Sequence, residues 1–261
     1  MKMNDERFAA ALAAAELDRP EARKCIGTLG EHTLHFVLKH YCESNSGFHE
    51  QKIGRYYADV CNGSMIYEVQ TRALYKLAPK LRDFLPHYSV NVVFPVFGIK
   101  RIVWTDSSTG ETTTARRSPR AGRITDALPE LYGLHEFFDH PEFRLTLVMF
   151  DGTEYRVYDG GSRAGRRRAH RLDVVPESIA DIRELGCMDD CRETFAKLLP
   201  DRFTASSLYR SLKLYGVKGW RALRFLRECG AVAESGKQGR QTVYETRPVR
   251  YDMEGGGVSG V

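Results

Sequence analysis

The chain has 261 residues, and its 39 Lys and Arg against 34 Asp and Glu give a formal net charge of +5. Hydrophobic residues make up 42% of the chain and charged residues 28%, which is typical of globular proteins that bury a core. This composition excludes general disorder, and no apolar run approaches the length of about 18 residues that a membrane-spanning helix needs.

The N-terminal segment is rich in alanine and predicts a helix within residues 1–24. Asp5, Glu6 and Glu16 flank or interrupt its apolar run, which favours a helix over an export signal. Without an export signal we expect a cytoplasmic protein whose six cysteines are free thiols.

Helical and strand patterns alternate over the next part of the chain. Apolar residues recur at spacings of three and four from Leu34 to Tyr41, which predicts an amphipathic helix, and Asn62-Gly63 between two β-rich runs predicts a hairpin. This alternation predicts an α/β or α+β domain. The elements expected in chain order are a helix over 28–43, strands over 51–60 and 64–71, a helix over 74–85 that Pro79 delays or kinks, strands over 89–97 and 100–105, a helix over 124–138 and a strand over 144–150.

The pattern changes near residue 187 to helices followed by a hairpin, which is the order of a winged helix. Thr204 is suited to cap one helix and Gly230 to end another. We expect helices over 190–199, 205–215 and 220–229, with Trp220, Leu223 and Leu226 on one face, and a hairpin of 231–234 and 241–246 around a turn at 235–239. The expected organisation is an N-terminal helix (1–24), an α/β core (25–186), a winged-helix domain (187–250) and a disordered tail (251–261).

The net charge is distributed unevenly along the chain. It is +1 over residues 1–99, +3 over 100–171, −4 over 172–206 and +5 over 207–261. Arginine presents a planar fork of donors that suits phosphate, so the basic clusters favour a polyanion such as DNA, although an isolated cluster equally suits a solvated loop. The candidate nucleic-acid-binding residues are Arg116, Arg117, Arg120 and Arg123 in one loop, Arg166, Arg167 and Arg168 in a Gly-rich loop over 159–171, and Lys218, Arg221, Arg224, Lys237 and Arg240 in the winged helix.

Acidic residues occur on both expected strands of the first hairpin. Glu68 and Gln70 are two apart on one strand, so both project from the same face, and Asp59 lies on the partner strand. Paired carboxylates suit a hard divalent ion such as Mg²⁺, with the Val69 carbonyl as a further oxygen ligand. The same spacing also suits a strand cap and a solvated sheet face, and it leaves both interpretations open.

The stretch 58–72, together with the run 80–95 that follows it, resembles the core of the PD-(D/E)XK nuclease superfamily. In that superfamily a helix, a β-hairpin bearing D…(D/E)xK, a second helix and a central strand follow one another. The stretch is also similar to an uncharacterised bacterial family of this type, whose members join such a core to a C-terminal winged helix. The resemblance would span roughly residues 29–246 and implies a restriction-endonuclease-like fold.

The resemblance also implies the chemistry of the site. Asp59 and Glu68 would bind Mg²⁺ or Mn²⁺, Glu31 would assist from the preceding helix, and a metal-activated water would hydrolyse a phosphodiester bond of DNA. Gln70 would be the remaining catalytic residue. It departs from the motif, which has lysine at this position, because glutamine can orient water but carries no charge.

Three further residues near the motif have open roles. Arg72 or Lys76 could supply the cation that Gln70 lacks. Glu50 is either a further carboxylate beside the metal or a surface residue, and the second interpretation is the favoured one.

An alternative function is a non-enzymatic DNA-binding protein or regulator with a degenerate nuclease core. It would act through the wing and the last helix, Arg227 included, and its affinity would fall steeply with salt. A winged helix can also mediate protein contacts, and the oligomeric state is left open. Neither the Cys187–Cys191 pair nor the histidines at 32, 35 and 40 have a metal-site pattern, and no small-molecule cofactor motif is evident.

Overall fold

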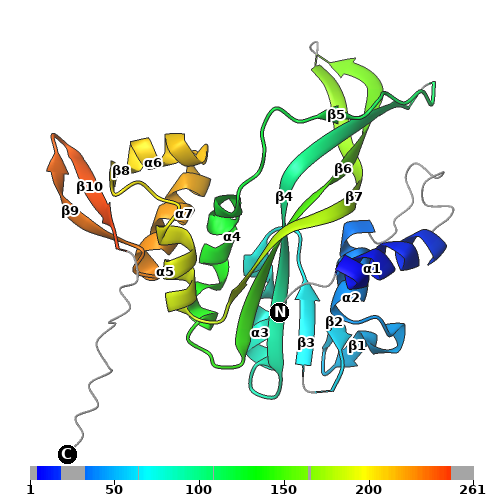
Figure 1. Ribbon diagram of the computed structural model, residues 1–261, viewed down its shortest axis with the longest axis horizontal. Coiled ribbons are helices and arrows are strands. Elements are labelled where there is room, and N and C mark those ends of the chain that lie inside the picture. The colour runs from blue at the N-terminus through cyan, green and yellow to red at the C-terminus, as the bar shows by residue number, and fades with distance from the viewer. Residues whose placement is uncertain (1–4, 19–32, 64, 108, 164–165, 248–261) are drawn as a thin grey trace, which may run out of the picture.

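The computed structural model describes residues 5–18, 33–63, 65–107, 109–163 and 166–247, and for residues 159–170 it describes only the backbone. Figure 1 shows a long, curved sheet with helices on both faces and a smaller unit of helices and strands near the C-terminus. The protein is therefore of the mixed α/β class that the sequence predicts.

The large sheet is mixed, with the strand order β1-β2-β3-β4-β6-β7 and with β5 paired to β4. Strands β1 to β3 form an antiparallel meander, β3 and β6 run parallel to β4, and β7 is antiparallel to β6. The strands are β1 (His49–Ile53), β2 (Tyr56–Cys61), β3 (Met65–Val69), β4 (Ser89–Asp106), β5 (Arg116–Arg117), β6 (Phe143–Arg163) and β7 (Arg166–Leu185).

Helices cover both faces of this sheet because its central strands are apolar on both sides. On one face, Leu34 and Leu38 pack against Val69 and Val93. On the other face, Leu81 and other apolar helical residues pack against the sheet in a larger cluster. The helices are α1 (Asp5–Asp18), which covers α2 (Thr33–Cys42), and on the opposite face α3 (Ala78–Phe84) and α4 (Leu128–Leu131), the last flanked by 3₁₀ turns.

The C-terminal unit has three helices and an antiparallel sheet of order β8-β10-β9. Thr204 caps its second helix as expected, since its side chain accepts a hydrogen bond from the Ser207 backbone N–H. The elements are α5 (Met188–Ala196), β8 (Arg202–Thr204), α6 (Ala205–Leu212), α7 (Val217–Glu228), β9 (Val232–Gln238) and β10 (Gln241–Thr246). The added strand β8, between α5 and α6, is one that the sequence pattern does not reveal.

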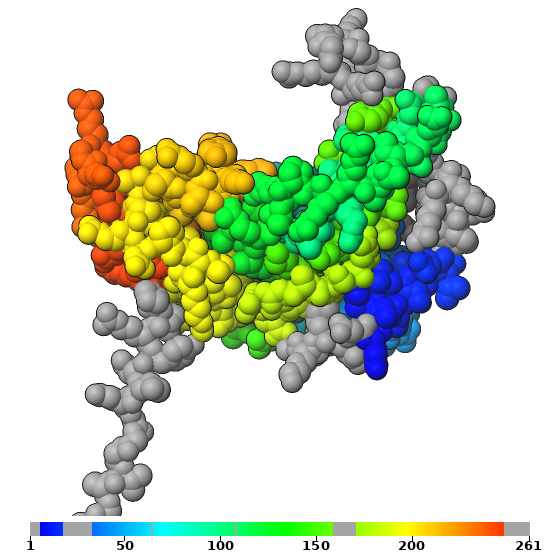
Figure 2. Space-filling view, turned by 45° about the horizontal axis from the view of Figure 1, so that its top comes forward, coloured from blue at the N-terminus to red at the C-terminus, as the bar shows by residue number. Residues whose placement is uncertain are grey.

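The C-terminal unit packs directly on the helical layer of the large sheet. The rings of Phe138 and Phe225 have centroids 6.0 Å apart, and those of Tyr132 and Trp220 lie 5.5 Å apart. Buried residues of the unit and of the sheet belong to one apolar cluster. Figure 2 shows the unit, in yellow to red, in close contact with the green segment of the body.

Several expected elements differ from the structure because turns and strand lengths depend on pairing partners. The expected strand over 51–60 is a hairpin, β1 and β2, that turns at Gly54, where φ is 57°. The expected strands over 89–97 and 100–105 form the single strand β4, and Pro79 lies in the first turn of α3 after a 3₁₀ turn.

The Gly-rich loop expected over 159–171 is a wrong assignment, because the described residues 159–163 and 166–171 form the paired ends of β6 and β7. Likewise, the expected five-residue turn at 235–239 belongs mostly to β9, and the chain turns at Gly239 and Arg240. Of the three residues expected on one face of their helix, Leu223 and Leu226 are buried, whereas Trp220 is 51% exposed.

Two other expectations concern the described residues as a whole. None of the described helices is long and apolar enough to cross a membrane. The cysteines that the structure describes, Cys42, Cys61, Cys187, Cys191 and Cys229, are free thiols.

Candidate active site

The two predicted carboxylates meet where β2 and β3 begin to diverge. Val60 pairs with Tyr67 and Cys61 with Ile66, and one more step in this register places Asp59 opposite Glu68. Asp59 Oδ2 accepts a hydrogen bond from the Val69 backbone N–H at 2.7 Å, and Glu68 Oε1 lies 3.4 Å from the Asp59 backbone N that donates to it. The hairpin therefore brings Asp59 and Glu68 together, as the sequence predicts.

Glu68 is buried, with only 2% of its surface exposed. Burial and, after it, repulsion by the nearby Asp59 carboxylate together raise its pKa to about 7, against the opposing attraction of Lys80. A buried acid with a raised pKa beside a second carboxylate is a common feature of functional sites.

Lys80 completes this cluster from α3. Its ammonium Nζ donates to Glu68 Oε2 at 2.6 Å, and its side chain is 16% exposed. Arg72 and Lys76, which the sequence analysis considered as sources of this cation, are exposed instead. The sequence carries a signal for Lys80, because it occupies the i+3 position of the buried stripe Leu77, Leu81 and Phe84, where a charged residue is unexpected.

His35 reaches the same place from α2. Its Nε2 lies 3.3 Å from Asp59 Oδ2, and its side chain is partly buried. His40, on the same helix, is buried. The sequence pattern could not reveal this role, since His35 lies beside the apolar face of α2 and not on it.

The remaining residues of the predicted site are placed differently. Gln70 donates through its side-chain Nε2 to the Arg72 carbonyl at 2.7 Å, so its amide is engaged by the local backbone. Glu31 lies outside the described residues. Glu50 forms an ion pair with Lys39 at 2.5 Å on β1, which agrees with the surface interpretation.

The side chains of Asp59 and Glu68 offer the type of ligand atom that a hard cation binds. Asp59 and Glu68 supply carboxylate oxygens, which together with main-chain carbonyls are the ligands that Mg²⁺ prefers. Within the described part of the chain, however, no group of three or more His, Cys, Asp or Glu side chains is gathered closely enough to hold a metal. The two carboxylates would thus provide a partial coordination shell that water and substrate oxygens must complete.

The predicted basic residues fall into three surroundings. Arg116 and Arg117 form β5 against β4 and are exposed. Arg120 pairs with Asp126, and Arg123 donates to the Ser211 carbonyl at 3.0 Å. The side chains of Arg166, Arg167 and Arg168 lie outside the described part, although their backbone belongs to β7.

In the C-terminal unit the basic residues divide between paired and exposed ones. Arg224 forms an ion pair with Glu228, and Arg227 pairs with Glu234. The side chains of Lys218, Lys237 and Arg240 are exposed, the last two at the tip of the β9–β10 hairpin, and Arg221 is half-buried.

The fold and the site together define a mixed α/β protein with a carboxylate–lysine cluster at one end of β3. A family model described as "Domain of unknown function (DUF8091)" matches residues 32–186, and the chain belongs to this family. The matched residues contain the whole large sheet and all four members of the cluster, His35, Asp59, Glu68 and Lys80.

A similar protein extends the likeness beyond that domain. An "Uncharacterized protein" of Treponema pallidum (strain Nichols) is 29% identical over 227 residues, which cover 85% of this chain and 88% of the relative. No solved structure gives a significant match.

Proposed function

We propose that the protein is a metal-dependent nuclease of the PD-(D/E)XK type that hydrolyses phosphodiester bonds of DNA. The observation that carries this proposal is the buried Glu68, held between Asp59 on the neighbouring strand and Lys80 on the following helix. A pair of carboxylates and an ammonium group supply the three functions of such a site, which are metal binding, orientation of water and stabilisation of negative charge.

The order of the elements supports the proposal independently of the motif. Helix α2 precedes the antiparallel meander β1-β2-β3, helix α3 follows, and β4 then runs parallel to β3. This is the element order of the superfamily core that the sequence resembles. The C-terminal order of α5, α6 and α7 followed by the β9–β10 hairpin supports a winged-helix assignment for that unit.

Lys80 accounts for the departure at Gln70. In the resembled motif a lysine two residues after the acid supplies the cation, whereas here Lys80 approaches Glu68 from α3. A positive charge close to the phosphate would stabilise the charge that develops on it. The Glu68 carboxylate holds the Lys80 ammonium in place, and Asp59 is oriented by the Val69 N–H. A bound divalent ion would supply an activated water and neutralise negative charge on the phosphate.

Cleavage assays with conservative variants test this function. Plasmid and single-stranded DNA are incubated with Mg²⁺ or Mn²⁺ and with wild type, Asp59→Asn or Glu68→Gln. Asp59→Asn can still accept from the Val69 N–H, whereas Glu68→Gln keeps one of the two hydrogen bonds that Glu68 accepts. Each variant loses a metal-binding charge, so we expect cleavage to fall by about 100-fold or more.

Asp83→Asn is the matched control, because Asp83 is an exposed carboxylate paired with Arg55 at 2.9 Å. It should cleave like wild type. Absence of cleavage by wild type with either metal, or equal cleavage by Asp59→Asn and wild type, would refute the proposal.

A non-enzymatic DNA-binding protein is the second candidate, and the exposed hairpin tip with Lys237 and Arg240 favours it. If these residues contact phosphates, the logarithm of the binding constant should fall linearly as the logarithm of the salt concentration rises. Lys237→Ala combined with Arg240→Ala should reduce that slope by about 2. A slope that does not change in the double variant, measured on a duplex by fluorescence anisotropy, excludes this role of the wing.

A further inference from the structure

One edge of β4 is uncovered directly beyond the carboxylate–lysine cluster. The pairing of β3 with β4 ends at Val69 and Val93, and the Gln70 N–H donates to the Val93 carbonyl at 3.0 Å. Strand β4 continues, and the loop after β5 contacts it again at Phe97 and Gly98, where Gly122 lies close to the Phe97 carbonyl and its N–H donates to the Gly98 carbonyl at 2.8 Å. Among the described residues, no strand pairs with this edge over 94–97.

The identity of Pro95 fits this uncovered edge. Pro95 lies two residues after Val93, so its backbone faces the same edge of the strand. Proline has no N–H to leave without a partner and is accepted in strands mainly at such edges. The sequence thus allows β4 to remain open here instead of recruiting another strand.

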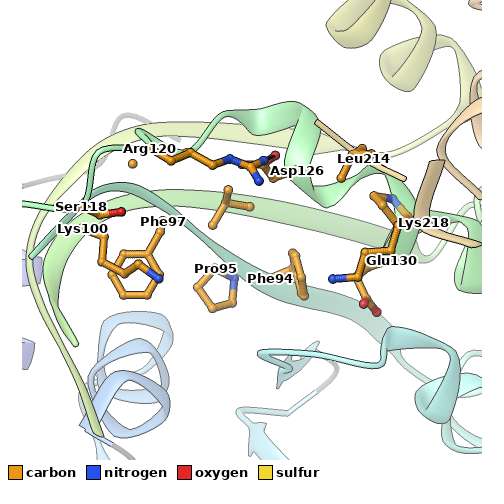
Figure 3. Close-up of a pocket in the computed structure, with 14 residues that line it drawn as sticks. Phe94, Pro95, Phe97, Lys100, Ser118, Arg120, Asp126, Glu130, Leu214 and Lys218 are labelled. Carbon is orange, nitrogen blue, oxygen red and sulfur yellow. Dashed lines mark hydrogen bonds and ion pairs between the residues drawn. The ribbon is translucent and has the colours of Figure 1, made fainter. Parts of the chain in front are cut away.

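A groove of about 360 Å³ occupies the gap. Figure 3 shows Phe94, Pro95 and Phe97 in a row along β4, with Arg120 and Asp126 on the opposite wall. Lys100 lies toward one end of the row and Lys218, from the first turn of α7, toward the other. The groove is therefore built by the large sheet, the loop after β5 and the C-terminal unit together.

The charges around the groove favour an anionic occupant. Three cations, Lys100, Arg120 and Lys218, line it against two acids, Asp126 and Glu130. Arg120 pairs with Asp126 and Lys100 pairs with Glu154, which leaves Lys218 as the cation that favours an anion. Lys218 is exposed in the first turn of α7, where the helix dipole disfavours a cation. Helix stability therefore does not explain why a lysine occupies position 218, whereas a bound anion would.

The floor of the groove favours flat, apolar groups between these charges. Phe94 and Pro95 are buried, whereas Phe97 is partly exposed and projects from the opposite face of β4 to Phe94. The Lys100 ammonium lies 5.2 Å from the centroid of the Phe97 ring. Basic grooves with aromatic platforms bind single-stranded nucleic acids, because bases stack on the rings while the cations follow the backbone. A volume of about 360 Å³ suits one or two unpaired nucleotides and not a base-paired duplex.

We propose that this groove binds a single-stranded nucleic-acid segment, with a base against Phe97 and phosphates near Arg120 and Lys218. The inference rests on the proposed function in taking DNA as the substrate. Val92, the β4 partner of Glu68, is only two residues from Phe94. The occupied groove would thus place an unpaired nucleotide beside the phosphate to be cleaved. The expected substrate is therefore a single strand or the frayed end of a duplex.

Binding without metal tests the groove separately from cleavage. Anisotropy of labelled thymidine oligonucleotides of about 12 nucleotides is measured with the full chain in EDTA, beside a duplex of equal length and an abasic strand with the same phosphates. We expect Lys218→Glu to weaken single-strand binding about tenfold. We also expect the abasic strand to bind at least about fivefold more weakly than the normal one.

Lys52→Glu is the control, since Lys52 is an exposed lysine on β1 away from the groove, and thermal melting verifies that both variants fold. Equal binding by Lys218→Glu and Lys52→Glu, equal binding of normal and abasic strands, or tighter binding of the duplex would overturn the inference. If the single strand binds as expected but Mg²⁺ elicits no cleavage that depends on Asp59, the proposed function fails and the groove assignment stands.

Discussion

Lys80 is the residue whose chemistry most separates this site from the motif that it resembles. Its ammonium contacts Glu68 directly, while Gln70 is bonded to the neighbouring backbone. Because the charge comes from a helix and not from β3, we expect Lys80→Met to lower the cleavage rate by about 100-fold with a small change in KM. Lys80→Arg should retain part of the activity.

Lys76→Met is the matched control for this prediction, since Lys76 is an exposed lysine one helical turn earlier. Single-turnover cleavage rates distinguish the two positions. A Lys80→Met rate equal to that of Lys76→Met would show that the buried ion pair is structural only.

The raised pKa of Glu68 predicts a pH dependence of stability in the metal-free protein. Burial and Asp59 raise this pKa from an ordinary value of 4.5 to about 7, so the folded state binds a proton more tightly than the unfolded state. Its contribution to stability is therefore fully present below pH 4.5 and is lost as the pH rises to about 7. Urea unfolding in EDTA should show that Glu68→Gln lacks this loss.

Glu154 serves as a control, because its pKa is shifted in the opposite direction to that of Glu68. Burial raises its pKa, but hydrogen bonds and attraction from Arg156 and Lys100 outweigh burial and hold the pKa below 4.5. Stability from Glu154 is thus present above pH 4.5 and is lost as the pH falls through the lowered pKa. If Glu68→Gln changes the pH profile in the same direction as Glu154→Gln, the assignment for Glu68 is wrong.

Among the single elements, the loop after β5 is held in position by the close approach of Gly122 to β4. A Cβ on Gly122 would lie 1.7 Å from the Phe97 carbonyl oxygen, so only glycine allows the Gly122 N–H to reach Gly98. We expect Gly122→Ala to destabilise the protein by about 2–3 kcal/mol and to weaken single-strand binding, because the loop also carries Arg120.

Gly110→Ala tests whether this effect comes from the contact with β4. Gly110 has φ 73° in open space, so alanine there strains a turn without any collision. In chemical unfolding, Gly110→Ala should lose less stability than Gly122→Ala. Its binding of single strands should be unchanged. Equal binding losses in the two variants would argue against a specific role of the loop.

At the scale of the whole molecule, the C-terminal unit and the sheet share one apolar cluster. Phe225 is fully buried and lies against Phe138 and Phe195. We therefore expect a single calorimetric unfolding transition. Phe225→Ala should lower the free energy of unfolding by about 3–5 kcal/mol and still unfold in one transition. Two separate transitions in the wild type would show instead that the unit folds as an independent domain.

The pattern of the sequence predicts local features well where one short segment contains the whole signal. The Thr204 cap, the hairpin at Asn62-Gly63 and the approach of Asp59 to Glu68 follow from neighbouring residues and strand periodicity alone. The extent of β6 and β7 could not be predicted in this way, because each strand is stabilised along its length by a partner distant in the chain.

Residue types and their spacing predict the α/β class, the carboxylate pair and the uneven distribution of basic residues. That Lys80 and His35 join the pair and that Lys218 faces β4 across a groove becomes visible in the folded protein. The physical reason is that helix packing against the sheet determines which distant side chains meet, and residue spacing within one segment contains no information about that packing.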